Sequence, residues 1–150
     1  MDDRAARHAE QLIAGINQAG SQTLVRRMGI TIVMAAAQRA VATMPVAGNT
    51  QPYGVLHGGA SCVLAETIGS VASALHAGPD RITLGTEINA THHRSVSEGL
   101  VTAVATRVYG GSTMTTYEIV ITDERGHRVC TARLSCQLRD VVPGRRLGES

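Results

Sequence analysis

Large aromatic side chains are almost absent from this sequence. Its 150 residues include no Phe, no Trp and only three Tyr. Aliphatic residues, Ala and Met must therefore build the core, and such side chains favour elements that approach one another closely. The chain is long enough to bury a core, and we find no internal repeat or linker. We expect one domain over residues 1–150.

Cysteine pairs and metal-binding patterns are also lacking. The three cysteines form no CxxC pair. Cys130 and Cys136 are six residues apart in an expected strand, so about 20 Å at ~3.3 Å per residue separates them, too far for a disulfide. No second His or Asp stands at ligand spacing from His57 on its helix, and we expect neither a metal nor a cofactor. A reduced, cytoplasmic protein is the simplest interpretation.

The sequence has no strong charge imbalance and no targeting segment. Fourteen Lys and Arg oppose twelve Asp and Glu. The basic residues are scattered, whereas a nucleic-acid partner would favour a basic stripe. No apolar signal segment follows the charged N-terminus. No run approaches the ~18 apolar residues that span a bilayer, so we expect no membrane partner.

The hydrophobic pattern predicts two main helices and six strands. An amphipathic helix is expected at residues 2–19, within an N-terminal segment 1–20, and a second helix at 57–76. One long helix followed by an antiparallel meander indicates an α+β fold, with the helix laid across the sheet. The expected strands are 28–34, 39–44, 82–92, 100–109, 115–122 and 128–138, with a loose tail at 143–150.

The second helix opens at His57-Gly58-Gly59. Glycine lets a ligand approach the backbone, and first-turn N–H groups lie at the positive end of the helix dipole. Such a site suits an anion or a developing oxyanion. A Gly pair is a weak motif, and a glycine-rich turn that merely enters a helix is the more frequent case.

Glu66 is the only acidic residue of this helix, which has no Lys or Arg. It forms a stripe with Cys62 and Ser70 at i, i+4 and i+8. The alternative is that the stripe faces solvent, but a solvated stripe is usually richer in charge. We therefore expect Glu66 in an apolar setting and interpret it as functional.

Other charged residues are less distinctive. Adjacent His92 and His93 should point to opposite faces of a strand, so at most one should reach a given site. Arg94 and Arg107 are candidates for a phosphate, although a lone surface Arg is usually a solvated charge. Gly110-Gly111-Ser112 is also compatible with a simple hairpin turn.

These residues carry a resemblance to a known family. The stretch from Gln51 to Ser70, with Gln before His-Gly-Gly and Glu nine residues after the His, resembles the hotdog-fold thioesterases of the 4-hydroxybenzoyl-CoA and phenylacetyl-CoA type. Within them it is most similar to the branch that contains 1,4-dihydroxy-2-naphthoyl-CoA hydrolase. A second matching block runs from Gly85 to Ser95. The match is in register over residues 28–138, and the N-terminal helix lies outside it.

The resemblance implies a curved antiparallel sheet wrapped around a central helix, a homodimer and commonly a homotetramer. It implies hydrolysis of an acyl-CoA, with aryl-CoA thioesters such as hydroxybenzoyl- or dihydroxynaphthoyl-CoA as the expected substrates, Glu66 as nucleophile or general base and the Gly58 N–H as oxyanion donor. The turn at 109–114 departs from the family because it lacks a basic residue that some relatives carry. The other implied roles are polarising or positioning groups at Gln51 and His57, water placement by Ser70, and CoA binding by Gly85, His92, Arg94, Ser95, Tyr109, Gly110, Gly111 and Ser112.

Helix geometry independently predicts a site shared between two chains. His57 and Glu66 lie roughly 13 Å apart along the axis at 1.5 Å per residue. A thioester carbonyl needs a nucleophile at its carbon and a donor at its oxygen, each about 3 Å away. Two antiparallel helices related by a two-fold axis meet both requirements, which one helix does not easily meet.

Three other functions remain open. A dehydratase acting on hydroxyacyl thioesters would share the fold but want a His and a carboxylate in a different spacing. A non-catalytic acyl-CoA-binding module would not need Glu66 and would normally carry an effector domain. A plain scaffold is the third. The sequence does not name the acyl group, since small and aliphatic side chains would admit an aryl ring or a medium chain.

Overall fold

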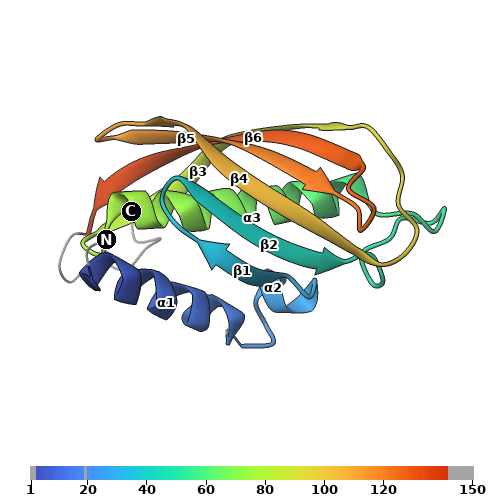
Figure 1. Cartoon of the computed structure of the whole chain (residues 1–150), viewed down its shortest axis with the longest axis horizontal. Coiled ribbons are helices and arrows are strands. Elements are labelled where there is room, and N and C mark those ends of the chain that lie inside the picture. Colours follow the sequence, from blue (N-terminus) through green and yellow to red (C-terminus); the bar gives the residue numbers. More distant parts are fainter. Residues whose placement is uncertain (1–2, 19, 142–150) are drawn as a thin grey trace.

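Six antiparallel strands form one sheet over a long central helix (Figure 1). The computed structural model describes residues 3–18 and 20–141. The sheet order is β1-β2-β4-β5-β6-β3, and every neighbouring pair is antiparallel. The α+β prediction is confirmed. The elements are α1 (Asp3–Asn17), α2 (Leu24–Arg27), β1 (Thr31–Ala35), β2 (Arg39–Pro45), α3 (Gly58–Ala77), β3 (Arg81–His92), β4 (Leu100–Gly110), β5 (Met114–Thr122) and β6 (Arg128–Asp140).

The predicted elements are close to the observed ones. Both main helices and all six strands are present, with ends that differ by up to three residues. The short helix α2 was not predicted; its N-cap is Thr23, whose hydroxyl accepts the Arg26 N–H. Residues 2 and 19 of the expected first helix and the expected tail at 143–150 lie outside the described residues.

Helix α3 packs closely on the inner face of the sheet because its buried side is small. Leu64, Ala65 and Ile68 are fully buried. At Gly69 an added Cβ would lie 2.6 Å from Leu134 Cδ2, so β6 approaches the helix at a position where only glycine fits without rearrangement. This close contact agrees with a core that has no Phe or Trp.

The sequence-based expectation that no segment is apolar enough to span a bilayer was wrong for α3. By length and composition alone, Gly58–Ala77 would qualify. In the structure half of the most apolar stretch of this helix is buried, with the sheet packed against it. Core helices pass the same compositional test, and here the burial follows from packing between the helix and the sheet.

The two edges of the sheet differ. At the β1 edge, the Asn17 amide donates to the Ile32 carbonyl (3.0 Å) and its oxygen accepts the Ile32 N–H (2.9 Å). Helix α1 runs beside this strand (Figure 1), with Leu12, Ile13 and Ile16 packed against the core. At the opposite edge, β3 has β6 as its only strand neighbour among the described residues. The twelve-residue strand β3 therefore leaves one side free to pair.

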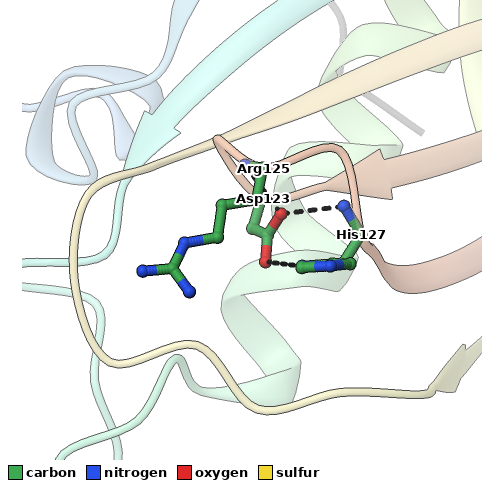
Figure 2. A network of polar contacts seen from close by, with 3 residues as sticks. All are labelled: Asp123, Arg125 and His127. Atoms are coloured by element: carbon green, nitrogen blue, oxygen red, sulfur yellow. Dashed lines mark hydrogen bonds and ion pairs between the residues drawn. The ribbon is translucent and has the colours of Figure 1, made fainter.

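The β5–β6 hairpin is held by one carboxylate (Figure 2). Asp123 Oδ1 accepts the Arg125 N–H (3.0 Å) and the His127 N–H (2.8 Å), and Oδ2 lies 3.1 Å from His127 Nδ1. Burial alone would raise the pKa of Asp123, but the hydrogen bonds from His127 and Arg125 outweigh it and lower the pKa. Charge and hydrogen bonding thus fix the turn that leads into β6.

Candidate active site

The first turn of α3 leaves one backbone donor free. His57 is the N-cap, and its Nδ1 accepts the Gly59 N–H at 2.9 Å. The next two N–H groups, of Ala60 and Ser61, both donate to the His57 carbonyl. The Gly58 N–H has no partner among the described residues, so it is the donor available to a ligand at the positive end of the helix.

Asn49 positions this first turn, and the sequence reading missed it. Its side-chain amide donates to the carbonyls of Met28 and Pro45, both at 2.8 Å, and its own carbonyl accepts the His57 N–H. Asn49 is buried. The only sequence signal for it is an Asn in a loop of Pro and Gly, because the groups that it binds include Met28 and are remote in the chain.

A cavity of about 340 Å³ opens beside the Gly58 N–H. The chain on either side of it is fixed by Leu56 N–H donating to the Val96 carbonyl and His93 N–H donating to the Val129 carbonyl. The lining residues are Gln51, Val55, Leu56, Gly58, Ser61, His92, His93, Arg94, Ser95 and Val129. They include five predicted site residues (Gln51, Gly58, His92, Arg94 and Ser95) but no carboxylate.

Both adjacent histidines reach this cavity, so the expectation that only one would do so was wrong. The physical reason is that β3 ends at His92, and strand alternation no longer applies to His93. The His92 ring packs on Gly58, where an added Cβ would lie 2.8 Å from His92 Nε2. His93 Nε2 lies 2.9 Å from the Thr131 hydroxyl.

Glu66 is exposed in the single chain, which corrects the expectation of an apolar setting. Cys62 and Ser70, on the same stripe, are half-buried. The carboxylate lies against β3, because an added Cβ at Gly85 would be 2.7 Å from Glu66 Oε1. Gly85 thus makes room for the carboxylate, which lies against the edge strand β3.

The predicted site residues form three groups within one chain. Glu66 is eight residues from Gly58, about 12 Å along the axis at 1.5 Å per residue. The turn Tyr109–Ser112 lies near His76, in the last turn of α3, so about 27 Å of helix separates it from Gly58 by the same rise. One chain does not bring the carboxylate, the free N–H and the turn together.

The cysteines are thiols in this arrangement. All three cysteines are free in the structure. Burial, and to a lesser degree the nearby Cys62 thiol, raises the pKa of Cys130 to about 11. Within the described residues no group of three His, Cys, Asp or Glu side chains is arranged to hold a metal ion.

Comparisons with known proteins decide the family. A model of the thioesterase superfamily matches residues 53–130, about half of the chain, including the His57–Glu66 segment and the Gly85–Ser95 block. The proofreading thioesterase EntH of Klebsiella pneumoniae is 44% identical over 126 residues, which are 83% of this chain and 92% of that protein. This chain belongs to the thioesterase superfamily.

Further comparisons agree with this thioesterase assignment. A putative esterase of Deinococcus radiodurans is 47% identical over 117 residues, which are 77% of this chain and 74% of that protein. The crystal structure of a Haemophilus influenzae thioesterase superposes with a TM-score of 0.83 at 37% identity, covering 89% of this chain and 94% of that one. The predicted hotdog fold and thioester-hydrolase activity are confirmed at this level.

Proposed function

We propose that this thioesterase hydrolyses acyl-CoA thioesters, aryl-CoA above all, at a site built by two chains. The proposal rests on the distance between Gly58 and Glu66 along α3 of one chain. The cavity beside Gly58 has a free N–H and no carboxylate, whereas Glu66 is exposed about 12 Å along the helix. A partner chain that turns its helix antiparallel brings its own Glu66 to this cavity.

The free edge of β3 supports a homodimer of this kind. Pairing of two β3 edges gives a two-fold axis and sets the two α3 helices side by side and antiparallel. Leu84 on β3 is an exposed apolar side chain, and Ile82 and Ile88 are half-buried. The β1 edge is occupied by Asn17, which favours β3 as the pairing edge. Association of two such dimers would give the homotetramer that the resemblance implies.

The antiparallel arrangement also brings the turn Tyr109–Ser112 to the site. If Gly58 of one helix lies opposite Glu66 of the other, the last turn of the second helix lies beyond the N-terminus of the first. The turn at Tyr109–Ser112 of one chain then flanks the cavity of its partner. Arg94 and Ser95 of the cavity and this turn would hold the CoA portion from two sides.

The chemistry follows from these positions. The thioester oxygen accepts the Gly58 N–H, and the His57 ring, with Nδ1 engaged by Gly59, has Nε2 left to assist as a donor. Glu66 either attacks the carbonyl carbon or removes a proton from an attacking water near Ser70. The resulting oxyanion is stabilised by the helix N-terminus. Its collapse breaks the C–S bond, and the CoA thiolate takes a proton from protonated Glu66 or from water. If Glu66 is the nucleophile, the product is a mixed anhydride, which water then hydrolyses to the free acid and the Glu66 carboxylate.

The test is a hydrolysis panel with wild type and Glu66→Ala. We expect benzoyl- and 4-hydroxybenzoyl-CoA to show a higher kcat/KM than palmitoyl-CoA. Glu66→Ala should lower kcat by at least ~10³ with the fold retained, because its carboxylate acts on the reacting atoms. A variant within tenfold of wild type would exclude this role of Glu66. A clear preference for long aliphatic chains would exclude the aryl assignment.

A further inference from the structure

His76 holds the turn between β4 and β5 with both ring nitrogens. Arg107 donates to His76 Nδ1 at 2.8 Å, and His76 Nε2 lies 3.0 Å from the Gly111 carbonyl oxygen. A guanidinium has no acceptor, so Nδ1 must accept and Nε2 must carry the proton that is donated to Gly111. The ring therefore links the end of α3 to the backbone of the turn in one defined tautomer.

Gly110 provides the space that this link needs. An added Cβ at Gly110 would lie 2.9 Å from both Arg107 Cδ and His76 Cε1. Gly110 has no positive φ, so the requirement for glycine there is steric and comes from the His76–Arg107 pair. The second cation at the turn is Arg81, which donates to the Ser112 carbonyl and pairs with Asp140 at 3.4 Å.

These contacts fix the direction of two peptide groups. In a trans peptide the N–H points opposite to the carbonyl that precedes it. His76 draws the Gly111 carbonyl inward, so the Ser112 N–H points outward, and Arg81 does the same for the Thr113 N–H. Neither N–H has a partner among the described residues, and Ser112 and Thr113 are exposed. Two successive N–H groups that point outward from a turn can donate to one anion.

We propose that His76 is a positioning residue for substrate binding, which orients the Ser112 and Thr113 N–H groups to bind a phosphate of the thioester's carrier. This inference rests on the proposed function and specifies how the turn takes part in it. It accounts for a turn that has no basic residue of its own, because the cations lie behind the turn and hold its carbonyls. Phosphate is supplied by CoA or by the phosphopantetheine arm of a carrier protein.

The test compares thioesters that share an acyl group and differ in phosphate. KM and kcat are measured for benzoyl-CoA, benzoyl-4′-phosphopantetheine and benzoyl-pantetheine with wild type, His76→Ala and His76→Gln. We expect His76→Ala to raise KM for the phosphate-bearing substrates about three- to tenfold, the effect of one lost hydrogen bond, with kcat nearly unchanged. KM for benzoyl-pantetheine should not change. Gln keeps one acceptor and one donor on the amide and should restore most of the binding.

The two phosphate-bearing substrates distinguish which phosphate the turn binds. If His76→Ala raises KM equally for benzoyl-4′-phosphopantetheine and benzoyl-CoA, the turn binds the phosphate that CoA and carrier proteins share. If KM rises for benzoyl-CoA alone, the turn binds a phosphate of the nucleotide part of CoA. Equal KM changes for all three substrates, or a fall in melting temperature with unchanged KM, would overturn the proposal and leave a structural role. Hydrolysis of none of them by wild type would instead contradict the proposed function.

Gly110→Ala is an independent probe, with Gly15→Ala as the matched control. The added methyl group at Gly110 meets His76 and Arg107, whereas at Gly15 it meets nothing within 4 Å. Gly110→Ala should raise KM for benzoyl-CoA as His76→Ala does, and the double variant should be no worse than either, because both act through one link. Fully additive effects would show that Gly110 acts separately and would contradict the proposed route.

Discussion

Asp123 accepts two backbone N–H groups in the β5–β6 turn and also contacts the His127 ring (Figure 2). Its folded-state pKa lies below the ordinary value of 3.8. Such a carboxyl contributes stability above its unfolded-state pKa and loses that contribution as the pH falls through the folded-state pKa. The contribution should therefore be complete at neutral pH and decline below about pH 4.

Asp123→Asn should lower the melting temperature at pH 7, since the amide oxygen is a weaker acceptor and carries no charge. The difference from wild type should shrink as the pH is lowered from 5 to 2.5, because the wild-type carboxyl becomes protonated. Thermal unfolding followed by circular dichroism across this range checks the prediction. A difference that is constant with pH would mean that the charge of Asp123 does not stabilise the hairpin.

The sequence pointed to those candidate site residues whose chemistry or spacing is unusual. Gly58 and Glu66 stood out as a helix-opening glycine and a lone carboxylate, and the structure adds a free N–H at one and an exposed side chain at the other. Asn49 and His76 were not found. Each acts through backbone groups that are distant in sequence, and no local pattern marks such contacts.

At the scale of elements, helical periodicity and strand alternation predicted the two main helices and all six strands. The strand order was not predictable in the same way, because β3 pairs with β6 rather than with β4, which follows it in the chain. That pairing depends on long-range packing over α3. The four-residue helix α2 is too short for a periodic signal and is set by its Thr23 cap.

The stripe of Cys62, Glu66 and Ser70 on α3 leads to a prediction about Cys62. It lies four residues from both Gly58 and Glu66, so an antiparallel pair that sets Gly58 against the partner's Glu66 sets the two Cys62 thiols near the two-fold axis. A mild oxidant or a short bis-maleimide should therefore give a covalent dimer. Non-reducing gel electrophoresis measures it. The other cysteines, Cys130 and Cys136, are buried.

Cys62→Ser should abolish this cross-link, while Cys136→Ser should leave it intact. The chain has no lysine, so thiol reagents give the cleanest readout. If native mass spectrometry detects a homodimer that neither oxidant nor bis-maleimide cross-links, the antiparallel register of α3 described here is wrong.

At the scale of the whole molecule, the proposed site needs two chains. Within the described residues, one chain has a cavity with a free Gly58 N–H, an exposed Glu66 and an unpaired sheet edge at β3. Helix rise alone predicts the shared site, and that prediction still awaits a test. The edge proposed for pairing was not predictable from the sequence, because it depends on the contacts of Asn17 with β1.

The most direct test of the shared site is complementation between Glu66→Ala and Gly58→Pro. Proline removes the Gly58 N–H at the first helical position, which tolerates it, and the preceding His57 already has extended backbone angles. Each homodimer should be nearly inactive. In a mixed dimer one site would carry both substitutions and the other neither, because the two-fold axis crosses the contributions.

Equimolar co-refolding should make half of the dimers mixed, each with one intact site, and restore about a quarter of wild-type activity. The measurement is hydrolysis of benzoyl-CoA, with heterodimers verified by native mass spectrometry and each variant shown to fold. The account predicts this recovery. A mixture that contains heterodimers and stays inactive would contradict it, and would place the whole site within one chain.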